Sequence, residues 1–462
     1  MDILQRLQQR QNETFDLHAQ HLNGQMVNVL KTIGFDRQYL RAEGPYLYDQ
    51  AGHRYLDLLA GFGVFALGRN HPTVVQVLRD ILGASLPNLV QLDVSLLAGL
   101  LAEKLVAVTP PGLDRIFFAN SGTETVEAAI KFSRYATGRR KIVYCAGGYH
   151  GLTLGSLSAT GDDYYRAGFG PLLEDFIEVP FGDLAALERA LQGRDVAAFI
   201  TEPIQGHGVW IPPADYLPGA ATLCQRTGTL LVADEVQTGL GRTGRWWAVN
   251  HWQVEPDILC TAKALSGGFV PVGAVACRRW IFERMFNRMD RAVVHGSTFG
   301  KNNLAMAAGL ATLEVLETEG LIENSARRGA QILAGLQPLV SQYECLKEVR
   351  GLGMMIGLEF AEPRSLALKM AWNMLEAANP GLFSQMITVP LLERHRILSQ
   401  VAGHGMNVVK FIPPLTLSEQ DVEWIVTGVT EVVADAHRVP GAAWDFGKSL
   451  ATRALRMKAG MS

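Results

Sequence analysis

An aspartate and a lysine follow two successive apolar runs and provide a carboxylate and a primary amine. Asp234 follows the run Leu230–Ala233, and Lys263 follows the run Ile258–Ala262. Short uninterrupted apolar runs of this kind are typical of strands buried in a parallel sheet. Ligands of open α/β sheets bind at the carboxyl ends of such strands, where both charges are expected. The pattern therefore predicts a buried acid and an amine at one ligand site.

The chemistry of these two side chains favours a cofactor that carries an aldehyde. An isolated Asp at a strand end is most often a helix cap or an ion-pair partner, and an isolated Lys is most often solvated. Lys263, however, is flanked by small residues and precedes Ser266-Gly267-Gly268. Pyridoxal 5′-phosphate (PLP) needs an amine for its aldehyde, an anion beside its pyridine nitrogen and donors for its phosphate. Lys263 and Asp234 supply the first two.

A turn between a strand and a helix supplies the third requirement. Ile116–Phe118 is expected to be a strand, and the apolar residues from Val126 onward recur at helical spacing. The turn Ser121-Gly122-Thr123 therefore opens a helix, whose free N–H groups and positive dipole end suit a phosphate. Taken alone, such a turn is more often a simple cap. Together with the acid and the amine it predicts a PLP site.

The motifs around these residues resemble those of the class III (subgroup II) aminotransferases, the family of the ornithine, acetylornithine, putrescine and 4-aminobutyrate transaminases. The likeness covers nearly the whole chain, from Gly44 to the segment that starts at Val408. The motifs in the family's order are NSGTETVEAAIK, GGYHGLTLGSLSATG, EPIQG, DEVQTGLGRTG, AKALSGG and HGSTFGKN.

The resemblance implies an α/β protein of the PLP-dependent transferase fold type I. That fold has a large domain with a mostly parallel central sheet and a smaller α+β domain built from both chain ends. The expected boundaries are 1–59 for the N-terminal part of the small domain, 60–317 for the large PLP-binding domain and 318–462 for the C-terminal part of the small domain.

By the same resemblance, individual residues take roles at the cofactor. Lys263 is expected to form the imine with PLP and to carry the substrate proton, and Asp234 to pair with the pyridinium. Thr298 is expected to reach the phosphate of the neighbouring subunit's cofactor, which makes a homodimer with shared sites part of the expectation. The other implied cofactor contacts are the phosphate residues Ser121, Gly122 and Thr123, the stacking ring of Tyr149 with His150 behind it, Glu202 as an ordering residue, and Gln237 near the ring hydroxyl.

Two positions depart from the ornithine- and 4-aminobutyrate-type members of the family. Those enzymes have Glu after EPIQG and Arg in the segment that ends in PPL, whereas this chain has His207 and Lys410. A lysine meets a carboxylate as a point charge without the bidentate fork of arginine, so carboxylate recognition should weaken. His207 either faces the substrate or packs against Trp210, and the sequence leaves both readings open.

An apolar segment between Phe360 and Val408 is longer than in putrescine-type relatives. Its helices either close the smaller domain or roof an entrance for a long apolar amine or aldehyde. On the second reading, Phe62, Val64 and Phe65 are expected to line the opposite wall, with Phe65 as a substrate contact.

These features predict a PLP-dependent transaminase that moves an amino group, expected to be terminal, from an amine or amino acid to an aldehyde or keto acceptor. One alternative is an aminomutase resembling the glutamate-semialdehyde enzyme, and another is an ornithine or diamine transaminase that uses Lys410 in place of the arginine. A catalytically silent protein that kept the fold is a candidate from a different class. The intact Lys263, Asp234 and phosphate turn argue against it.

Composition agrees with an enzyme that acts on small molecules. The chain has 462 residues, of which 48% are hydrophobic, enough for a large core. A net charge of −3 with scattered Lys and Arg argues against a nucleic-acid partner. No apolar run approaches the roughly 20 residues that span a bilayer, so no membrane partner is expected. The five cysteines show no metal spacing, which favours reduced core thiols and a cytoplasmic location.

Local patterns predict an amphipathic helix over 1–43, a hairpin over 44–59 and βα alternation up to about residue 317. The remainder is expected to be helical around one strand pair, with Val349–Phe360 as its clearest strand signal.

Overall fold

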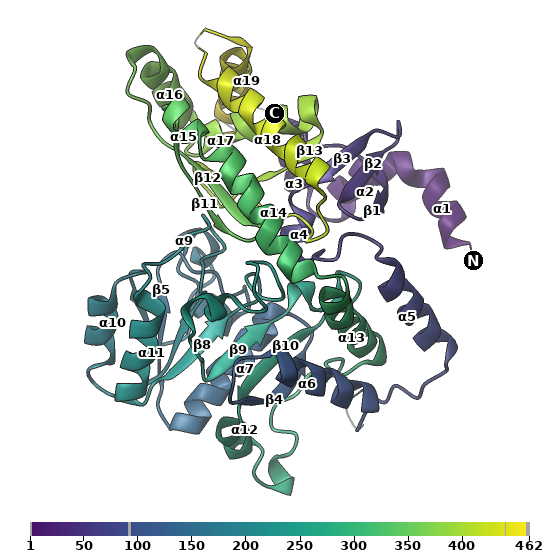
Figure 1. Ribbon diagram of the computed structural model, residues 1–462, viewed down its shortest axis with the longest axis vertical. Coiled ribbons are helices and arrows are strands. Elements are labelled where there is room, and N and C mark those ends of the chain that lie inside the picture. Colours follow the sequence, from purple (N-terminus) through teal and green to yellow (C-terminus); the bar gives the residue numbers. More distant parts are fainter. Residues whose placement is uncertain (1, 91–93, 439, 459–462) are drawn as a thin grey trace.

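A seven-stranded sheet forms the centre of the largest part of the molecule (Figure 1). The computed structural model describes residues 2–90, 94–438 and 440–458. The strand order of this sheet is β4-β10-β9-β8-β7-β5-β6, and β10 is antiparallel to both of its neighbours while the other pairs are parallel. The strands are β4 Leu113–Ala119, β5 Lys141–Cys145, β6 Phe176–Val179, β7 Val196–Thr201, β8 Leu230–Asp234, β9 Ile258–Thr261 and β10 Gly273–Arg278.

Helices cover this sheet and explain why its central strands are buried throughout and mostly apolar. Every residue of β7, β8 and β9 is buried. Helix α7 packs on β7, β9 and β10 through an apolar face that includes Val126, Ala129 and Phe132. The other helices of this part are α6 Leu96–Val108, α7 Gly122–Thr137, α8 Leu154–Ser158, α9 Asp163–Arg166, α10 Leu184–Leu191, α11 Tyr216–Thr227, α12 Arg279–Met285 and α13 Asn303–Thr318, with 3₁₀ turns η2 Ala248–Trp252, η3 Lys263–Ser266 and η4 Met289–Arg291.

A second, antiparallel sheet has the order β11-β12-β15-β14. Its strands are β11 Leu346–Leu352, β12 Met355–Phe360, β14 Gln400–Val401 and β15 Val408–Phe411. The expected strand pair is therefore the hairpin β11–β12, and β15 and β14 extend it to four strands. The helices around it are α14 Leu321–Leu336, α15 Leu339–Gln342, α16 Leu366–Ala378, α17 Leu382–His395, α18 Glu419–Ala436 and α19 Ala442–Lys458.

The N-terminal strands meet a strand from the far end of the sequence. The third sheet has the order β1-β2-β3-β13, and β13 Ile397–Leu398 pairs in parallel with β3 Arg54–Asp57. This pairing brings both chain ends into one region, as expected for the smaller domain, whose boundaries stay a prediction. The remaining elements are β1 Tyr39–Glu43, β2 Tyr46–Asp49, α4 Ala60–Gly63 and α5 Pro72–Gly83.

The structure corrects the expectation of a single helix over residues 1–43. The segment forms α1 Ile3–Arg10, η1 Gln11–Glu13, α2 Thr14–His21 and α3 Gly24–Thr32 before β1 begins. Asn23 caps α3 by accepting a hydrogen bond from the Met26 N–H at 3.1 Å, which starts a new helix where the pattern had suggested continuity.

The apolar segment after Phe360 closes the smaller domain. The Phe383 ring of α17 packs at 4.5 Å from the Trp372 ring of α16 and at 5.9 Å from the Trp444 ring of α19. Phe383 and Met386 are fully buried in this core. The expectation that these helices roof an entrance is corrected, because the large apolar side chains at their contact, such as Phe383 and Met386, pack within this core.

Candidate active site

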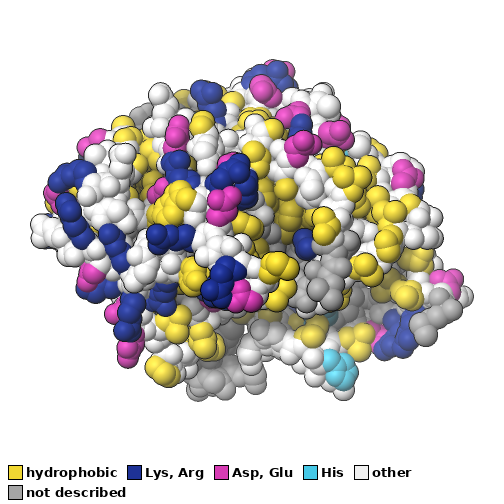
Figure 2. All heavy atoms as spheres, turned by 90° about the horizontal axis from the view of Figure 1, so that it is seen from below, with side chains coloured by type: hydrophobic (Ala, Val, Ile, Leu, Met, Phe, Trp, Pro, Cys, Tyr) yellow, Lys and Arg dark blue, Asp and Glu magenta, His cyan; other side chains and the backbone are white. Residues whose placement is uncertain are grey.

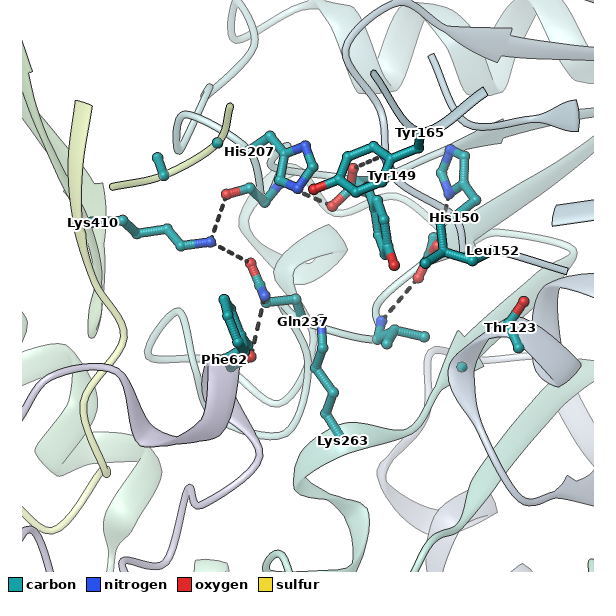
Figure 3. A pocket seen from close by; sticks show the side chains of 18 of the residues that line it. Phe62, Thr123, Tyr149, His150, Leu152, Tyr165, His207, Gln237, Lys263 and Lys410 are labelled. Atoms are coloured by element: carbon teal, nitrogen blue, oxygen red, sulfur yellow. Dashed lines mark hydrogen bonds and ion pairs between the residues drawn. The ribbon is translucent and has the colours of Figure 1, made fainter. Parts of the chain in front are cut away.

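Asp234 and Lys263 lie at the carboxyl ends of two adjacent parallel strands. Asp234 is the last residue of β8 and lies opposite Cys260 of β9, and Lys263 begins the 3₁₀ turn that follows β9. Both side chains border one cavity of about 660 Å³, and Figure 3 shows Lys263 in it. Burial lowers the pKa of the Lys263 ammonium, although the charges of Asp234 and Glu202 oppose this shift. A lowered pKa increases the fraction of neutral amine, which is the nucleophilic form.

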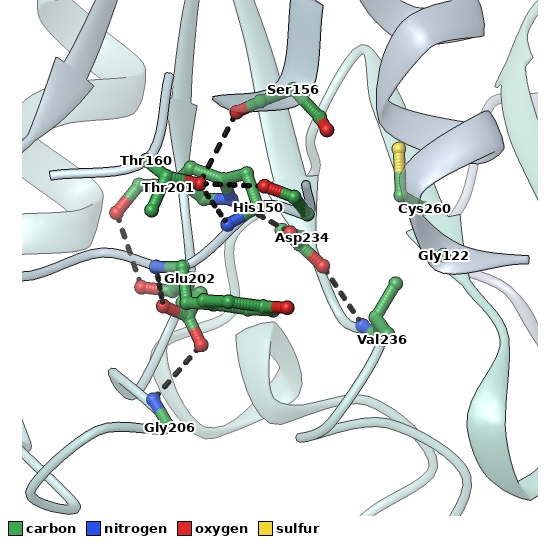
Figure 4. Close-up of polar contacts among 12 residues, drawn as sticks. Gly122, His150, Ser156, Thr160, Thr201, Glu202, Gly206, Asp234, Val236 and Cys260 are labelled. Carbon is green, nitrogen blue, oxygen red and sulfur yellow. Dashed lines mark hydrogen bonds and ion pairs between the residues drawn. The ribbon is translucent and has the colours of Figure 1, made fainter. Parts of the chain in front are cut away.

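A buried histidine holds Asp234 in place (Figure 4). The Nδ1 atom of His150 lies 2.7 Å from Oδ2 of Asp234, and Oδ1 accepts a hydrogen bond from the Val236 N–H at 3.1 Å. Burial alone would lower the pKa of His150, but the hydrogen bond and charge of Asp234 raise it overall. These two contacts fix the orientation of the Asp234 carboxyl group inside the protein. Sequence reasoning placed His150 near the ring but missed this contact.

Glu202 ties two loops of the cavity together. Its Oε1 accepts a hydrogen bond from the Tyr149 N–H at 2.9 Å, and its Oε2 accepts one from the Gly206 N–H at 2.9 Å. Burial raises the pKa of this carboxyl group, with His150 opposing the shift and Asp234 adding to it. Glu202 thereby fixes the loop that carries Tyr149 and the loop that leads to His207.

The predicted phosphate turn opens α7. Ser121 is the N-cap residue and accepts a hydrogen bond from the Glu124 N–H at 3.3 Å. Gly122 and Thr123 border the main cavity, whereas Ser121 borders a smaller neighbouring one. A Cβ atom at Gly122 would lie 2.9 Å from Cγ1 of Val236, so a side chain there would collide. Close packing of Val236 therefore requires glycine at position 122, and the start of α7 borders the cavity, where an anion is favoured.

Lys410 reaches the cavity from β15 of the second sheet. Its Nζ donates hydrogen bonds to the Gly206 carbonyl at 2.9 Å and to Oε1 of Gln237 at 3.2 Å. Gln237 in turn donates from Nε2 to the Phe62 carbonyl at 3.2 Å. Burial, together with the nearby charge of Lys263, lowers the pKa of Lys410 to about 7. Two of its three donors are used, which leaves one for a ligand.

His207 packs against two tyrosines of the cavity. Its ring centroid is 5.6 Å from that of Tyr165 and 5.2 Å from that of Tyr149. Trp210, the alternative packing partner, instead lies beneath the guanidinium of Arg350 at 3.8 Å. Burial and the charge of Lys410 lower the pKa of His207 to about 4, so the ring is neutral at pH 7. His207 therefore faces the cavity as an aromatic, uncharged wall.

Comparison with known proteins decides the family. The model of the class-III aminotransferases matches residues 31–433 of the chain. The protein belongs to the class III aminotransferases. Aminotransferase PigE of a Serratia species is 35% identical over 91% of this chain and 53% of its own length, so the chain spans about half of that relative. Putrescine aminotransferase of Pectobacterium atrosepticum is 45% identical over 69% of this chain and 70% of its own length.

The solved structures that resemble this chain are also aminotransferases. The ornithine aminotransferase of Toxoplasma gondii superposes with a TM-score of 0.77 at 31% identity, over 86% of this chain and 90% of its own. A PLP-bound amine transaminase from an uncultivated Pseudomonas species gives a TM-score of 0.73 at 31% identity, over 86% of this chain and 94% of its own. The predicted fold type I and the predicted transaminase class are confirmed, and the aminomutase alternative is not favoured.

This class III aminotransferase uses PLP to move amino groups. The residues of the cavity fit that cofactor: an amine at Lys263, an anion at Asp234 and a helix start at Gly122. Within the described ranges 2–90, 94–438 and 440–458, no group of three or more His, Cys, Asp or Glu side chains could hold a metal ion. Over the same ranges, no helix has the length and hydrophobicity to cross a membrane.

The Phe65 side chain does not border the cavity. Its ring lies 4.0 Å from the Arg69 guanidinium and packs against Gly61, while Phe62 borders the cavity. The backbone explains the difference, because Gly61 and Phe62 both have φ of 61° and this left-handed turn presents Phe62. Phe62 is thus the aromatic side chain of this turn that borders the cavity, and the expected substrate contact at Phe65 stays a prediction.

Thr298 is exposed and does not border the cavity of its own chain. The segment around Thr298 contacts α7 and the turn before it. Nδ1 of His295 lies 2.8 Å from Nζ of Lys131 in α7, and Ser297 accepts a hydrogen bond from Asn120 in the turn. A contact between Thr298 and a phosphate would have to be made in another subunit, and this role stays a prediction.

Proposed function

We propose that Lys263, Asp234 and the start of α7 form the catalytic site of a transaminase for terminal amines with an apolar body. The observation that carries this proposal is the convergence of all three on one cavity at the carboxyl end of the parallel sheet. The putrescine aminotransferase relative takes, by its name, a substrate with terminal amino groups, which supports the terminal position.

PLP, when bound, supplies the aldehyde and the electron-withdrawing ring that make the carbon next to the substrate amine acidic. The Lys263 amine holds the cofactor, then takes the proton from that carbon and returns it. Asp234 keeps the ring nitrogen protonated, and His150 orients Asp234 through their 2.7 Å contact. Gly122 and Thr123 bind the phosphate. Tyr149 and Val236, which both border the cavity, hold the ring.

The wall of the cavity supports an apolar substrate body. Phe62, Leu152, Tyr165 and Val401 border it, and His207 adds a neutral ring. Lys410 offers one free hydrogen-bond donor, and its pKa is about 7. An arginine would instead be permanently charged and would offer a fork of donors. A substrate carboxylate is therefore held weakly, and burial of an apolar chain contributes about 0.8 kcal/mol per methylene.

An amine series tests the reaction and the specificity together. With PLP bound and no acceptor present, hexylamine should release one carbonyl product per site and leave the amino group on the cofactor. The ratio of kcat/KM for the ω-carboxylate analogue to that for hexylamine should fall about tenfold as pH rises from one unit below to one unit above the Lys410 pKa of about 7. The sign follows because the lysine is charged below that pH and neutral above it.

Lys410→Met is the matched control, since it removes the titrating group and should leave this ratio constant with pH. Release of no carbonyl product from any amine would contradict the transaminase assignment. A pH-independent ratio in the unchanged enzyme would contradict only the role of Lys410.

We further propose a cytoplasmic homodimer in which Thr298 completes the partner's phosphate site. Hydrophobic side chains near Thr298 are exposed, including Val293 at 80% and Phe299 at 62%. Figure 2 shows hydrophobic side chains between charged ones across one face of the molecule. Surface of this kind is typical of protein interfaces. The five buried free thiols support a reducing compartment.

Thr298→Ala should weaken PLP binding about tenfold, because one hydrogen bond to a phosphate dianion is lost. The affinity should also fall on dilution below the dimer dissociation constant, measured by titration and by analytical ultracentrifugation. A monomer that binds PLP as tightly as the dimer would rule out the shared site.

A further inference from the structure

An aromatic stack links two segments that belong to different parts of the fold. The imidazole ring of His404 and the phenol ring of Tyr164 have centroids 4.2 Å apart and planes only 11° from parallel. His404 lies in the loop between β14 and β15 of the second sheet, whereas Tyr164 belongs to α9, one of the helices beside the central sheet. The catalytic roles described above involve neither residue.

On the α9 side, ring contacts continue from this stack to the cavity wall. The Tyr164 ring meets the neighbouring Tyr165 ring edge to face, with centroids 5.1 Å apart. Tyr165 borders the cavity and stacks on His207 (Figure 3). Asp162 caps α9 by accepting a hydrogen bond from the Tyr164 N–H at 3.0 Å, which fixes the backbone that carries both tyrosines. Four rings are therefore in contact from His404 at one end to His207 at the other.

On the other side, the stack holds a loop that forms a second part of the wall. Val401, Ala402 and Gly403 all border the cavity, and they directly precede His404 in the sequence. Lys410 enters the same cavity from β15, which pairs with β14 at the base of this loop. A movement of the loop would therefore displace three residues of the cavity wall.

The stack itself lies at the molecular surface. Tyr164 is 58% exposed and His404 is also exposed, and neither ring borders the cavity. The two rings thus meet where a wall from α9 and a wall from the β14–β15 loop reach solvent. The contribution of one aromatic pair is small beside the stability of a whole fold, so its loss should release the loop without unfolding the protein.

We propose that the Tyr164–His404 stack sets the width of the cavity entrance and thereby limits the enzyme to slender amines. While the rings are stacked, the β14–β15 loop is held toward α9. Loss of either ring frees the loop to move outward, which admits a wider apolar body, whereas a slender chain already fits. Tyr164 and His404 are positioning residues, because neither borders the cavity. The inference rests on the proposed function in one respect, namely that this cavity takes an apolar amine.

Comparison of hexylamine with naphthylethylamine tests this inference. Both compounds carry the reacting amine on a CH₂ group, so they undergo the same reaction and differ in the width of the apolar body. The full-length PLP-bound enzyme is assayed with each amine and a keto acceptor. His404→Ala should raise the ratio of kcat/KM for naphthylethylamine to that for hexylamine about three- to tenfold, the factor expected for loss of one aromatic pair. The hexylamine value itself should not change, which also reports that the variant is folded.

Two control variants separate the stack from general effects of substitution. His404→Phe keeps a flat ring that can stack on Tyr164 and should retain the original ratio. Phe169→Ala removes another exposed ring shortly after α9, one that does not border the cavity, and should leave both kcat/KM values unchanged.

A double-mutant cycle tests whether the two rings act together. Tyr164→Ala should also raise the ratio for naphthylethylamine, and adding His404→Ala to it should raise the ratio no further, because the contact is already lost. Additive effects would show that the rings act independently and would overturn the proposal.

Equal loss of kcat/KM for both amines in His404→Ala would also overturn the proposal, because it would show a structural role only. An unchanged ratio, or no reaction of naphthylethylamine in any variant while hexylamine is still converted, would show that the stack does not limit the entrance. Release of no carbonyl product from either amine would instead contradict the proposed function.

Discussion

Replacement of Lys263 by alanine should abolish turnover while leaving the protein folded. The Lys263 side chain is the amine that follows β9 and borders the cavity beside Asp234. Loss of a positioned proton carrier alone costs about 10²–10⁴ in kcat, and loss of the covalent attachment adds to it. The measurement is kcat with hexylamine and a keto acceptor, together with thermal unfolding.

Lys410→Met is the control for this experiment, because Lys410 is the other lysine that borders the cavity among the described residues. Lys410→Met should still bind PLP covalently. Turnover of Lys263→Ala at a rate near that of the unchanged enzyme would overturn the assignment of the catalytic amine.

Asp234→Asn should fold and bind PLP but turn over slowly. Asparagine has the same shape, yet it removes the charge that keeps the ring nitrogen protonated. Loss of one preorganised electrostatic contact in an active site costs about 10²–10³ in kcat, and an effect of that size is expected here. The same change removes the contacts that raise the pKa of His150, so burial should then lower that pKa.

Stopped-flow kinetics and the NMR titration of His150 check these two expectations. Glu202→Gln is a suitable comparison, since it keeps a carbonyl acceptor for one of the two N–H groups of Tyr149 and Gly206 and should slow turnover less. An Asp234→Asn enzyme with unchanged kcat would show that Asp234 does not act on the ring.

The positions of Asp234, Lys263 and the phosphate turn could be predicted because each is a local signal. An apolar run ends at a charge, or a small-residue turn precedes a helical pattern. Such signals can be recognised without knowing the fold, because a buried parallel strand requires apolar residues within its own short segment. The seven-stranded sheet brings the three together, as expected for ligand sites of α/β folds.

Contacts across long sequence separations could not be predicted. His150 and Asp234 are 84 residues apart, and Lys410 is 173 residues from Gln237. No pattern in either segment indicates the partner, because the pairing depends on how whole sheets pack. The same holds for Glu127, whose helical spacing in α7 says nothing of the α8 backbone that it caps.

Two differences between the sequence expectations and the structure have a physical cause in backbone conformation and packing. The aromatic pair Phe62 and Phe65 looks equivalent in sequence, but the positive φ at Phe62 turns one ring to the cavity and leaves the other on Arg69. The apolar pattern of α16 and α17 indicates burial without indicating what buries it. In the structure α19 does so, through Trp444, and the cavity receives only the residues that follow, such as Val401.

Reduction of the PLP-bound enzyme with borohydride, followed by peptide mass mapping, tests the central claim most directly. Reduction converts the imine between cofactor and lysine into a stable amine, which marks the attached residue. The cofactor mass should appear on the peptide that contains Lys263, with one label per chain, and should be absent from Lys263→Ala. A label on Lys410, or on any lysine other than Lys263, would contradict the account.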